Sequence, residues 1–336
     1  MNFVGVDLHK KTAVVCVVNQ TRQILETRRL ACSDPDRIRK WFATLESFQV
    51  VVEATASYEW FIKLIEPMAD RVVLAHPGKL RVIAESTRKS DKLDAKVLAE
   101  FLALDMIPEA YRPTPRQREH RQWVRHRQYL RVRVASIRNR LRRAFSNYNA
   151  DRPALFTAAG RKASAAIELS DVDRFTVNQL WRELDFFEEQ LDEVHKALQQ
   201  FAAKAPPAEA AARRLLRSIP GVGEITTEVF LAEVADVRRF RSQKRVVAYA
   251  GLAPTVRESA GRRHELGITH AGSRLLRWVV CQAAWQLVLR DAHWRRIFES
   301  LAARRGRKRA ITAVARRLLC VMTSMVMNGQ EYRRAA

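Results

Sequence analysis

The sequence predicts a mixed α/β unit, a long helical arm and a mainly helical C-terminal domain. Over residues 1–112, short runs rich in Val and Ile alternate with segments of helical character. Residues 116–148 contain neither Gly nor Pro, and residues 177–203 carry apolar side chains at alternating spacings of 4 and 3. The first pattern is typical of a sheet with helices and the second of long packed helices, so the fold class is α/β followed by all-α.

The first unit contains five strand-like runs and three helical segments. The expected strands are 3–7, 12–19, 23–30, 50–53 and 71–75. The expected helices are 36–47, which follows a capping Asp34, then 58–68 and the amphipathic segment 90–104. Pro77 stops the last strand. Three strands followed by helix, strand, helix and strand predict a mixed sheet flanked by helices.

Prolines mark the boundaries of the helical arm. Pro113 and Pro115 precede the first long helix, and Pro206-Pro207 follow the second. The heptad-like spacing of the second helix predicts that the two helices form a coiled-coil arm. The expected domains are therefore 1–112, 113–208 and 209–336.

The charge balance points to a polyanionic partner. Lys and Arg number 60 against 36 Asp and Glu, a net charge of +24, and 47 of the 60 are Arg. The excess is concentrated in residues 113–150, at +10, and in residues 209–336, at +15. A merely solvated basic surface would interleave both signs of charge. Arg binds phosphate bidentately, so nucleic acid is the expected partner.

The remaining composition argues for a cytoplasmic protein. The four cysteines lack paired spacing, which argues against zinc and against a disulfide framework. No apolar run is long enough to suggest the roughly 20 residues of a membrane span, and the first residues lack a signal-peptide pattern. We expect no membrane partner.

Four carboxylates are placed as a metal site would place them. Asp7 ends the first expected strand and Glu53 the fourth, while Asp91 and Asp94 lie three residues apart at a helix start. Mixed α/β sheets place their sites at such strand ends. Converging carboxylates repel one another unless cations neutralise them. Hard oxygen ligands predict Mg²⁺ or Mn²⁺ and phosphoryl chemistry.

In this order of residues the chain resembles the ribonuclease-H fold, in its Holliday-junction-resolvase branch. More specifically, it resembles the DEDD transposases of the insertion-sequence one-ten family. The resemblance implies a DNA transposase or recombinase whose catalytic, metal-binding residues are Asp7, Glu53, Asp91 and Asp94. That family carries a second domain downstream, so the C-terminal third is the next test.

The C-terminal third contains a turn typical of a helix-hairpin-helix. Residues 216–226 place Pro220, Gly221 and Gly223 between two helical segments, where backbone N–H groups can meet a DNA phosphate. A simple helix–helix connection is the alternative.

Residues 247–277 resemble the second transposase domain of the same family. Its Gly-Leu-x-Pro element appears as Gly251 to Pro254, followed by Ser259-Ala260-Gly261 where the family carries a serine nucleophile. The spacing is one residue looser than the commoner Ser-Gly pair, and Ser273 stands where Asn is more frequent. The resemblance implies that Ser259 forms a phosphoserine link to DNA. Three nearby arginines would bind the phosphate: Arg257, Arg262 and Arg263.

The basic helix is the expected nucleic-acid-binding element of the arm. The arginines expected to contact phosphate are Arg116, Arg125, Arg131, Arg138, Arg140, Arg142 and Arg143. The family resemblance also implies a structured noncoding guide RNA that pairs with target and donor DNA. A coiled coil pairs subunits, so a homo-oligomer, dimer or tetramer, is expected.

Three other functions compete with this interpretation. A structure-selective, junction-resolving nuclease would use the carboxylates without the serine. A sugar kinase of the same fold needs a Gly-rich phosphate turn after its first Asp, which residues 8–12 lack. An architectural nucleic-acid binder would leave four carboxylates, which repel phosphate, without a purpose.

Overall fold

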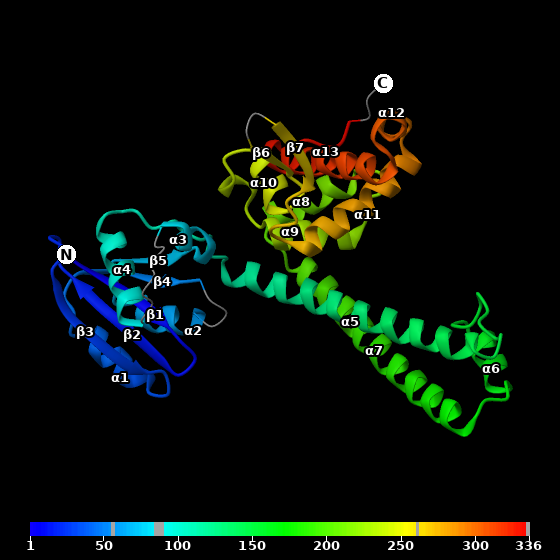
Figure 1. Ribbon diagram of the computed structural model, residues 1–336, viewed down its shortest axis with the longest axis horizontal. Helices are drawn as coiled ribbons and strands as arrows, with labels where there is room; N and C mark the ends of the chain where they lie inside the picture. Colours follow the sequence, from blue (N-terminus) through cyan, green and yellow to red (C-terminus); the bar gives the residue numbers. More distant parts are fainter. Residues whose placement is uncertain (55–57, 84–90, 260–261, 334–336) are drawn as a thin grey trace. The chain divides into compact units, whose positions relative to one another are not determined.

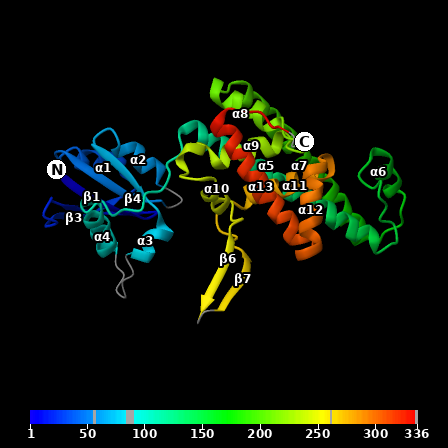
Figure 2. The same cartoon turned by 90° about the horizontal axis from the view of Figure 1, so that it is seen from above.

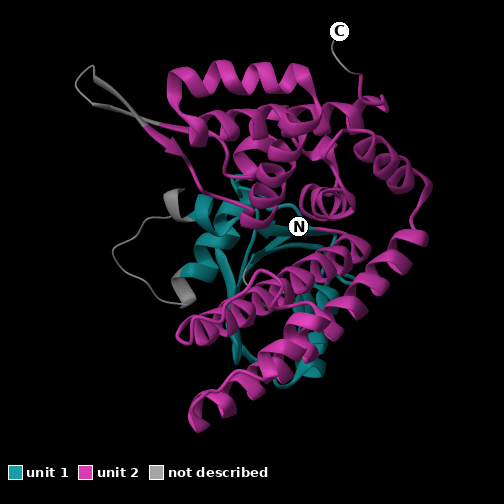
Figure 3. Cartoon of the chain, turned by 90° about the vertical axis from the view of Figure 1, so that its right-hand side faces the viewer, with its two compact units in different colours: residues 1–112 teal, residues 113–336 magenta. Residues whose placement is uncertain are grey.

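A computed structural model of the protein describes residues 1–54, 58–83, 91–259 and 262–333 (Figure 1). The chain forms two units, Met1–Arg112 and Pro113–Ala336, coloured separately in Figure 3. The second unit holds both the expected arm and the expected C-terminal domain.

The first unit is built on a five-stranded mixed sheet with strand order β3-β2-β1-β4-β5. The strands are β1 (Asn2–Leu8), β2 (Thr12–Val18), β3 (Ile24–Ala31), β4 (Phe48–Glu53) and β5 (Arg71–Ala75). β1 pairs antiparallel with β2 and parallel with β4, and β4 pairs parallel with β5. The predicted mixed sheet is therefore confirmed, and it fits the ribonuclease-H-like fold.

Helices cover both faces of this sheet. On one face, α1 (Pro35–Phe42) and α2 (Glu59–Ile65) bury Phe42 and Ile62 against Val4 and Val50. On the other face lie α3 (Pro77–Ile83) and α4 (Asp91–Ala103), which contribute to the remaining apolar clusters. Burial of these apolar side chains from water stabilises the three-layer arrangement.

One helix of this unit ends earlier than predicted, and another was not predicted. The first helix ends at Phe42 rather than at 47, because the following residues turn into β4, which already begins at Phe48. Pro77 does stop β5, but it also opens the unforeseen α3. Proline suits a first helical turn because its missing N–H would have no partner there.

The second unit begins with two long helices that lie side by side (Figure 1). α5 (Pro115–Ser146) starts with a capping box between Thr114 and Gln117. α7 (Asp171–Ala203) begins before the expected 177, because Ser170 caps its first turn. The apolar residues of this turn and the next, Val172 and Phe175, are exposed and do not continue the apolar stripe of the helix. Between them lies the short α6 (Ala158–Ala165). The two long helices share a core of apolar residues: Val134, Ile137, Leu141, Phe145, Val177, Leu180, Trp181 and Leu184.

The remainder of this unit is mainly helical, as predicted. Its helices are α8 (Pro207–Arg217), α9 (Glu224–Val234), a 3-10 turn (Val237–Arg239), α10 (Gln243–Tyr249), α11 (Arg274–Arg290), α12 (Ala292–Arg305) and α13 (Arg307–Asn328). Their core includes Val124 of α5 and Leu198 of α7. Because one end of the long helices is buried in this core, arm and C-terminal helices form one unit.

A β-hairpin in the C-terminal part was not predicted. Strands β6 (Pro254–Ser259) and β7 (Arg262–Ile268) pair antiparallel, and Figure 2 shows the hairpin projecting away from the helices of its unit. The two segments are mostly polar or charged, so they lack the alternating apolar side chains that identify a strand facing a core.

One helix of the described chain, α13, is long and apolar enough to cross a membrane by length and composition. The sequence-based expectation that no run approached this length was too strict. Much of α13 is buried in the core of its unit, including Val314, Leu318 and Met322. A buried core helix passes the same test, so this single helix is weak evidence for a membrane span.

Candidate active site and nucleic-acid interface

Asp7 and Glu53 lie at the same level on neighbouring strands. In the parallel pairing of β1 with β4, Val6 is opposite Val52, and each carboxylate residue follows its valine directly. Neighbouring strands are about 4.8 Å apart, so the two residues occupy adjacent positions at one edge of the sheet. The expected convergence of these two strand-end positions is therefore present.

Both carboxylate residues belong to the face of the sheet that α4 covers. Side chains along a strand alternate between faces, so Asp7 shares its face with Gly5, and Glu53 shares its face with Val51. Gly5 lies under α4, and Val51 packs in a cluster with Leu98 of that helix.

Gly5 determines how closely α4 approaches the sheet. A Cβ atom at this position would lie 2.0 Å from the carbonyl oxygen of Ala95 and 2.5 Å from the backbone nitrogen of Ala99. Any other residue would push the helix away. Asp91 begins α4 one turn before Ala95, and Asp94 is exposed on the same first turn. The side chain of Asp91 lies outside the described residues.

His9 is a contact of this site that the sequence analysis missed. Its Nε2 lies 2.9 Å from Oδ2 of Asp7, whose side chain is only 14% exposed. The sequence signal for His9 was weak, because a single His just after a strand is common on protein surfaces. The contact gives the Asp7 carboxylate a hydrogen-bond donor that helps to orient it.

The donor set fits a hard divalent cation in chemistry but is incomplete in the described part. Asp7, Glu53 and Asp94 offer only carboxylate oxygens, the ligands that Mg²⁺ and Mn²⁺ prefer. Among the described side chains, no three potential ligands lie close enough together to hold an ion. The Asp91 side chain, the fourth expected ligand, is not among them.

Ser259 is the last residue of β6 and pairs across the hairpin with Arg262. Arg257 pairs with His264 in the same register, and directly opposed residues share a face of a two-stranded sheet. Ser259, Arg257 and Arg262 thus belong to one face. Arg263, opposite Glu258, belongs to the other face. The side chains of all these residues lie outside the described ones.

The two glycines between α8 and α9 have different surroundings. Gly221 has φ +86°, and a Cβ there would lie 2.8 Å from Cβ of Gln286 and from the backbone nitrogen of Leu287. This glycine therefore packs against α11. Gly223 is exposed, has open space around it and precedes α9 without a side-chain cap. A phosphate can contact the backbone only where solvent reaches it, so Gly223 is the better candidate of the two glycines.

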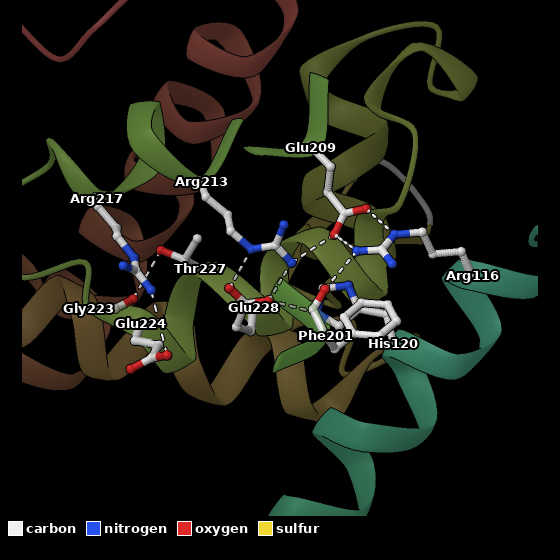
Figure 4. A network of polar contacts seen from close by, with 10 residues as sticks. All are labelled: Arg116, His120, Phe201, Glu209, Arg213, Arg217, Gly223, Glu224, Thr227 and Glu228. Carbon is white, nitrogen blue, oxygen red and sulfur yellow. Dashed lines mark hydrogen bonds and ion pairs between the residues drawn. The ribbon is translucent and has the colours of Figure 1, made fainter. Parts of the chain in front are cut away.

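Two arginines near the start of α5 are held by carboxylates of the same unit, and Figure 4 shows the first of them, Arg116. Arg116 donates two hydrogen bonds to Glu209, of 2.7 and 3.0 Å, and its guanidinium lies 3.9 Å from the ring centre of Phe201. Arg125 donates two bonds, of 2.8 and 3.0 Å, to the buried carboxylate of Glu233. Both arginines therefore have structural contacts.

Glu228 is the centre of this polar network (Figure 4). Its side chain is 2% exposed and accepts hydrogen bonds from Arg213, two of 2.8 Å, and from His120, of 2.9 Å. Burial alone would raise the pKa of Glu228, but these bonds outweigh burial and lower it to about 2. This network was not predicted from the sequence, although charged residues within the apolar α9 segment signal that buried charges need partners.

The arginines further along α5 have fewer hydrogen bonds to carboxylates. Arg131 lies over Trp278, Arg138 bonds Glu188, and Arg142 bonds Asp151. Arg140 and Arg143 are exposed, and within the described part of the chain no carboxylate lies at ion-pair distance from either. Their guanidinium groups are therefore accessible to an added phosphate.

Two family models match this chain. One, for DEDD transposases of the IS110 type and described as a transposase, matches residues 4–150, which include Asp7, Glu53 and α5. The other, described as the transposase IS116/IS110/IS902 family, matches residues 213–299, which include Gly221 and Ser259.

Two similar proteins match most of this chain, and a third matches about a third of it. The transposase for insertion sequence element IS1111A of Coxiella burnetii is 24% identical over 99% of this chain and 92% of its own length. The transposase for insertion sequence element IS1328 of Yersinia enterocolitica is 24% identical over 84% of this chain and 83% of its own. An IS110 protein of Streptomyces coelicolor is 30% identical over 35% of this chain and 29% of its own.

The two family matches and the similar proteins identify a transposase, an enzyme that acts on DNA. The chain belongs to the IS110 family of DEDD transposases.

Proposed function

We propose that this insertion-sequence transposase cleaves and exchanges DNA strands at a site formed by Asp7, Glu53, Asp91 and Asp94. The observation that carries the proposal is the parallel register of β1 and β4, which puts Asp7 and Glu53 at adjacent positions under α4. A cluster of carboxylates at a sheet edge has no role in packing and would repel DNA unless it bound cations.

The four carboxylates would hold Mg²⁺ or Mn²⁺, which supplies Lewis acidity toward the phosphate oxygens when bound. The residues of this chain orient the ion and the strand. His9 holds the Asp7 carboxylate through its 2.9 Å contact. Gly5 lets α4 pack directly on the sheet, so the first turn of α4, with Asp91 and Asp94, is fixed relative to the strands.

Ser259 is the proposed nucleophile of strand exchange. Its Oγ forms a bond to phosphorus while the bond from phosphorus to the leaving DNA oxygen breaks. The serine proton is lost and a proton is taken up by the leaving oxygen, so the step is balanced without a cofactor such as ATP. The backbone register, which places Arg257 and Arg262 on the face of Ser259, supports a phosphate-binding role for both. Arg263 is the weaker candidate, because it belongs to the other face.

The proposal also includes nucleic-acid binding by the second unit. Arg140 and Arg143 of α5 and the exposed Gly223, in the helix-hairpin-helix-like turn between α8 and α9, are the contacts we assign to phosphates. We also propose that the protein binds a structured guide RNA and that a coiled-coil arm holds it in an oligomer. Support for the RNA is the basic charge of α5 without an element suited to reading base edges.

The test is strand cleavage by the full chain with matched variants. We expect Asp7→Asn and Glu53→Gln to abolish cleavage in Mg²⁺ while DNA binding persists or tightens, because negative charge is removed. Asp36→Asn changes an exposed acid of α1 and is the control that should keep full activity. Unchanged cleavage by Asp7→Asn would overturn the proposed site.

Covalent chemistry is tested on the same reaction. After quenching in denaturant and digestion of the DNA, we expect a nucleotide adduct on the peptide containing Ser259. Ser259→Ala should lack it, and Ser242→Ala, which changes a nearby serine without a side-chain cap bond, should keep it. Cleavage by Ser259→Ala at the wild-type rate would instead identify a junction-type nuclease that hydrolyses without a serine.

A further inference from the structure

One face of α5 carries an aromatic and basic cluster with no role in the core. The rings of His126 and Tyr129 are nearly parallel, at 13°, with 6.1 Å between their centres. The guanidinium of Arg133 lies 5.0 Å from the centre of the Tyr129 ring. All three residues are exposed, and 48% of Tyr129 is accessible to solvent. The cluster therefore presents flat, preformed surfaces to solvent.

This cluster belongs to a longer stripe of α5. Arg140 and Arg143 follow Arg133 after seven and ten residues, spacings that return to the same side of a helix. Residues facing α7, such as Val134 and Leu141, lie on a different side. From 126 to 143 the helix rises by about 25 Å, enough to follow several nucleotides.

The charge of the stripe is uncompensated. Glu119 is the only acidic residue in α5, and it lies about two turns before His126. Within the described chain, Arg133, Arg140 and Arg143 have no carboxylate at ion-pair distance, in contrast to Arg116 and Arg125. An anionic ligand would therefore not have to displace an internal partner.

We propose that His126, Tyr129 and Arg133 stack an unpaired base of a single-stranded nucleic acid, while Arg140 and Arg143 bind its phosphates. This inference rests on the proposed function, and it names the form of nucleic acid that the arm binds. Stacking on aromatic and guanidinium planes suits unpaired nucleotides, whose base faces are free. In a duplex those faces are covered by neighbouring base pairs. Unpaired RNA and unpaired DNA share this chemistry.

The experiment is a binding titration of the full chain against 12-nucleotide unpaired RNA, unpaired DNA and duplex DNA. We expect Tyr129→Ala to weaken binding to at least one unpaired strand by about fivefold or more, and Tyr129→Phe to retain it, because stacking needs only the ring. The dependence on salt should stay unchanged in Tyr129→Ala. Arg140→Gln, which removes a proposed phosphate contact, should lower the slope of log affinity against log salt on the unpaired strand by about 0.7. Which unpaired strand is affected distinguishes RNA from DNA.

Phe186→Ala is the matched control. Phe186 is an aromatic residue of α7 that is 56% exposed to solvent. Its substitution by Ala should leave the affinities for all three nucleic acids unchanged. Equal losses in Tyr129→Ala and Phe186→Ala, or an equal loss for duplex DNA, would overturn the stacking proposal. So would wild-type affinity of Tyr129→Ala for both unpaired strands. Metal-dependent cleavage by the wild-type chain is measured in parallel, so a failure of the proposed function is seen separately.

Discussion

The two ends of α5 use the same residue type for different purposes. Near its start, Arg116 and Arg125 are bound to Glu209 and Glu233, and Arg121 donates to the last carbonyls of α9. Toward its end, Arg140 and Arg143 are exposed without such partners in the described chain. Arginine content alone therefore does not identify a nucleic-acid contact; the position of neighbouring carboxylates does.

The difference has a physical cause. At the start of α5, α8 and α9 bring carboxylates beside the arginines, and the buried charges of Glu228 and Glu233 must be paired. Burial would raise the pKa of Glu209, yet bonds from Arg116 and Arg213 lower it instead. At the other end, the described apolar side chains of α5 pack with those of α7 and of the connection to it, and the side chains of Arg140 and Arg143 stay exposed. Four predictions test this contrast.

The largest effect should come from removing the centre of the buried network. Glu228→Ala leaves Arg213 buried without its main acceptor, so we expect a loss of about 3–5 kcal/mol in the free energy of unfolding, measured in urea. Glu224→Ala is the control on the same helix. Its side chain is exposed and lies 3.6 Å from Arg217, so the loss should stay below about 1 kcal/mol. Equal losses of unfolding free energy in the two variants would mean that burial of the carboxylate does not determine its contribution to stability.

The same carboxylate predicts a dependence of stability on pH. The folded pKa of Glu228 is about 2 against an ordinary 4.5, so its contribution is present above pH 4.5 and lost as pH falls toward 2. We expect about 3 kcal/mol to disappear over this window. Glu228→Gln should flatten that part of the wild-type profile. A parallel profile for the variant would contradict the assignment.

Exchanging arginines at the two ends should separate stability from binding. Arg125→Gln leaves the buried Glu233 without its bidentate donor, and we expect a loss of about 1–3 kcal/mol with no change in the salt dependence of DNA binding. Arg140→Gln should instead change the salt dependence of binding and leave stability nearly unchanged. It should cost less than about 0.5 kcal/mol and lower the slope of log affinity against log salt by about 0.7 on an unpaired strand. If both variants changed stability and salt dependence equally, the two ends of α5 would not differ in function.

The smallest effect concerns the first turn of α5. Thr114 accepts a hydrogen bond from the backbone of Gln117, so Thr114→Ala should lower the free energy of unfolding by about 1 kcal/mol. Thr114→Ser keeps the acceptor oxygen and should recover most of this loss. No difference between the two variants would show that solvent replaces the cap.

The sequence alone determined the elements that depend on local patterns. Five strands, a mixed sheet and two long helices follow from apolar periodicity and from proline positions, because these constrain the backbone without distant partners. The adjacency of Asp7 and Glu53 was also predictable, since each lies at or next to the end of a buried strand. Their partnership with Asp91 and the role of Ser259 remain predictions, because those side chains lie outside the described residues.

Only the tertiary structure decided which charged and apolar residues face one another. The polar β6–β7 hairpin is formed by cross-strand pairing and has no apolar signal, and α13 is apolar because it fills a core. Whether an arginine of α5 holds Glu233 or faces solvent depends on where α9 packs, more than 100 residues away in the chain. Such contacts arise from long-range burial, and composition and spacing carry no information about them.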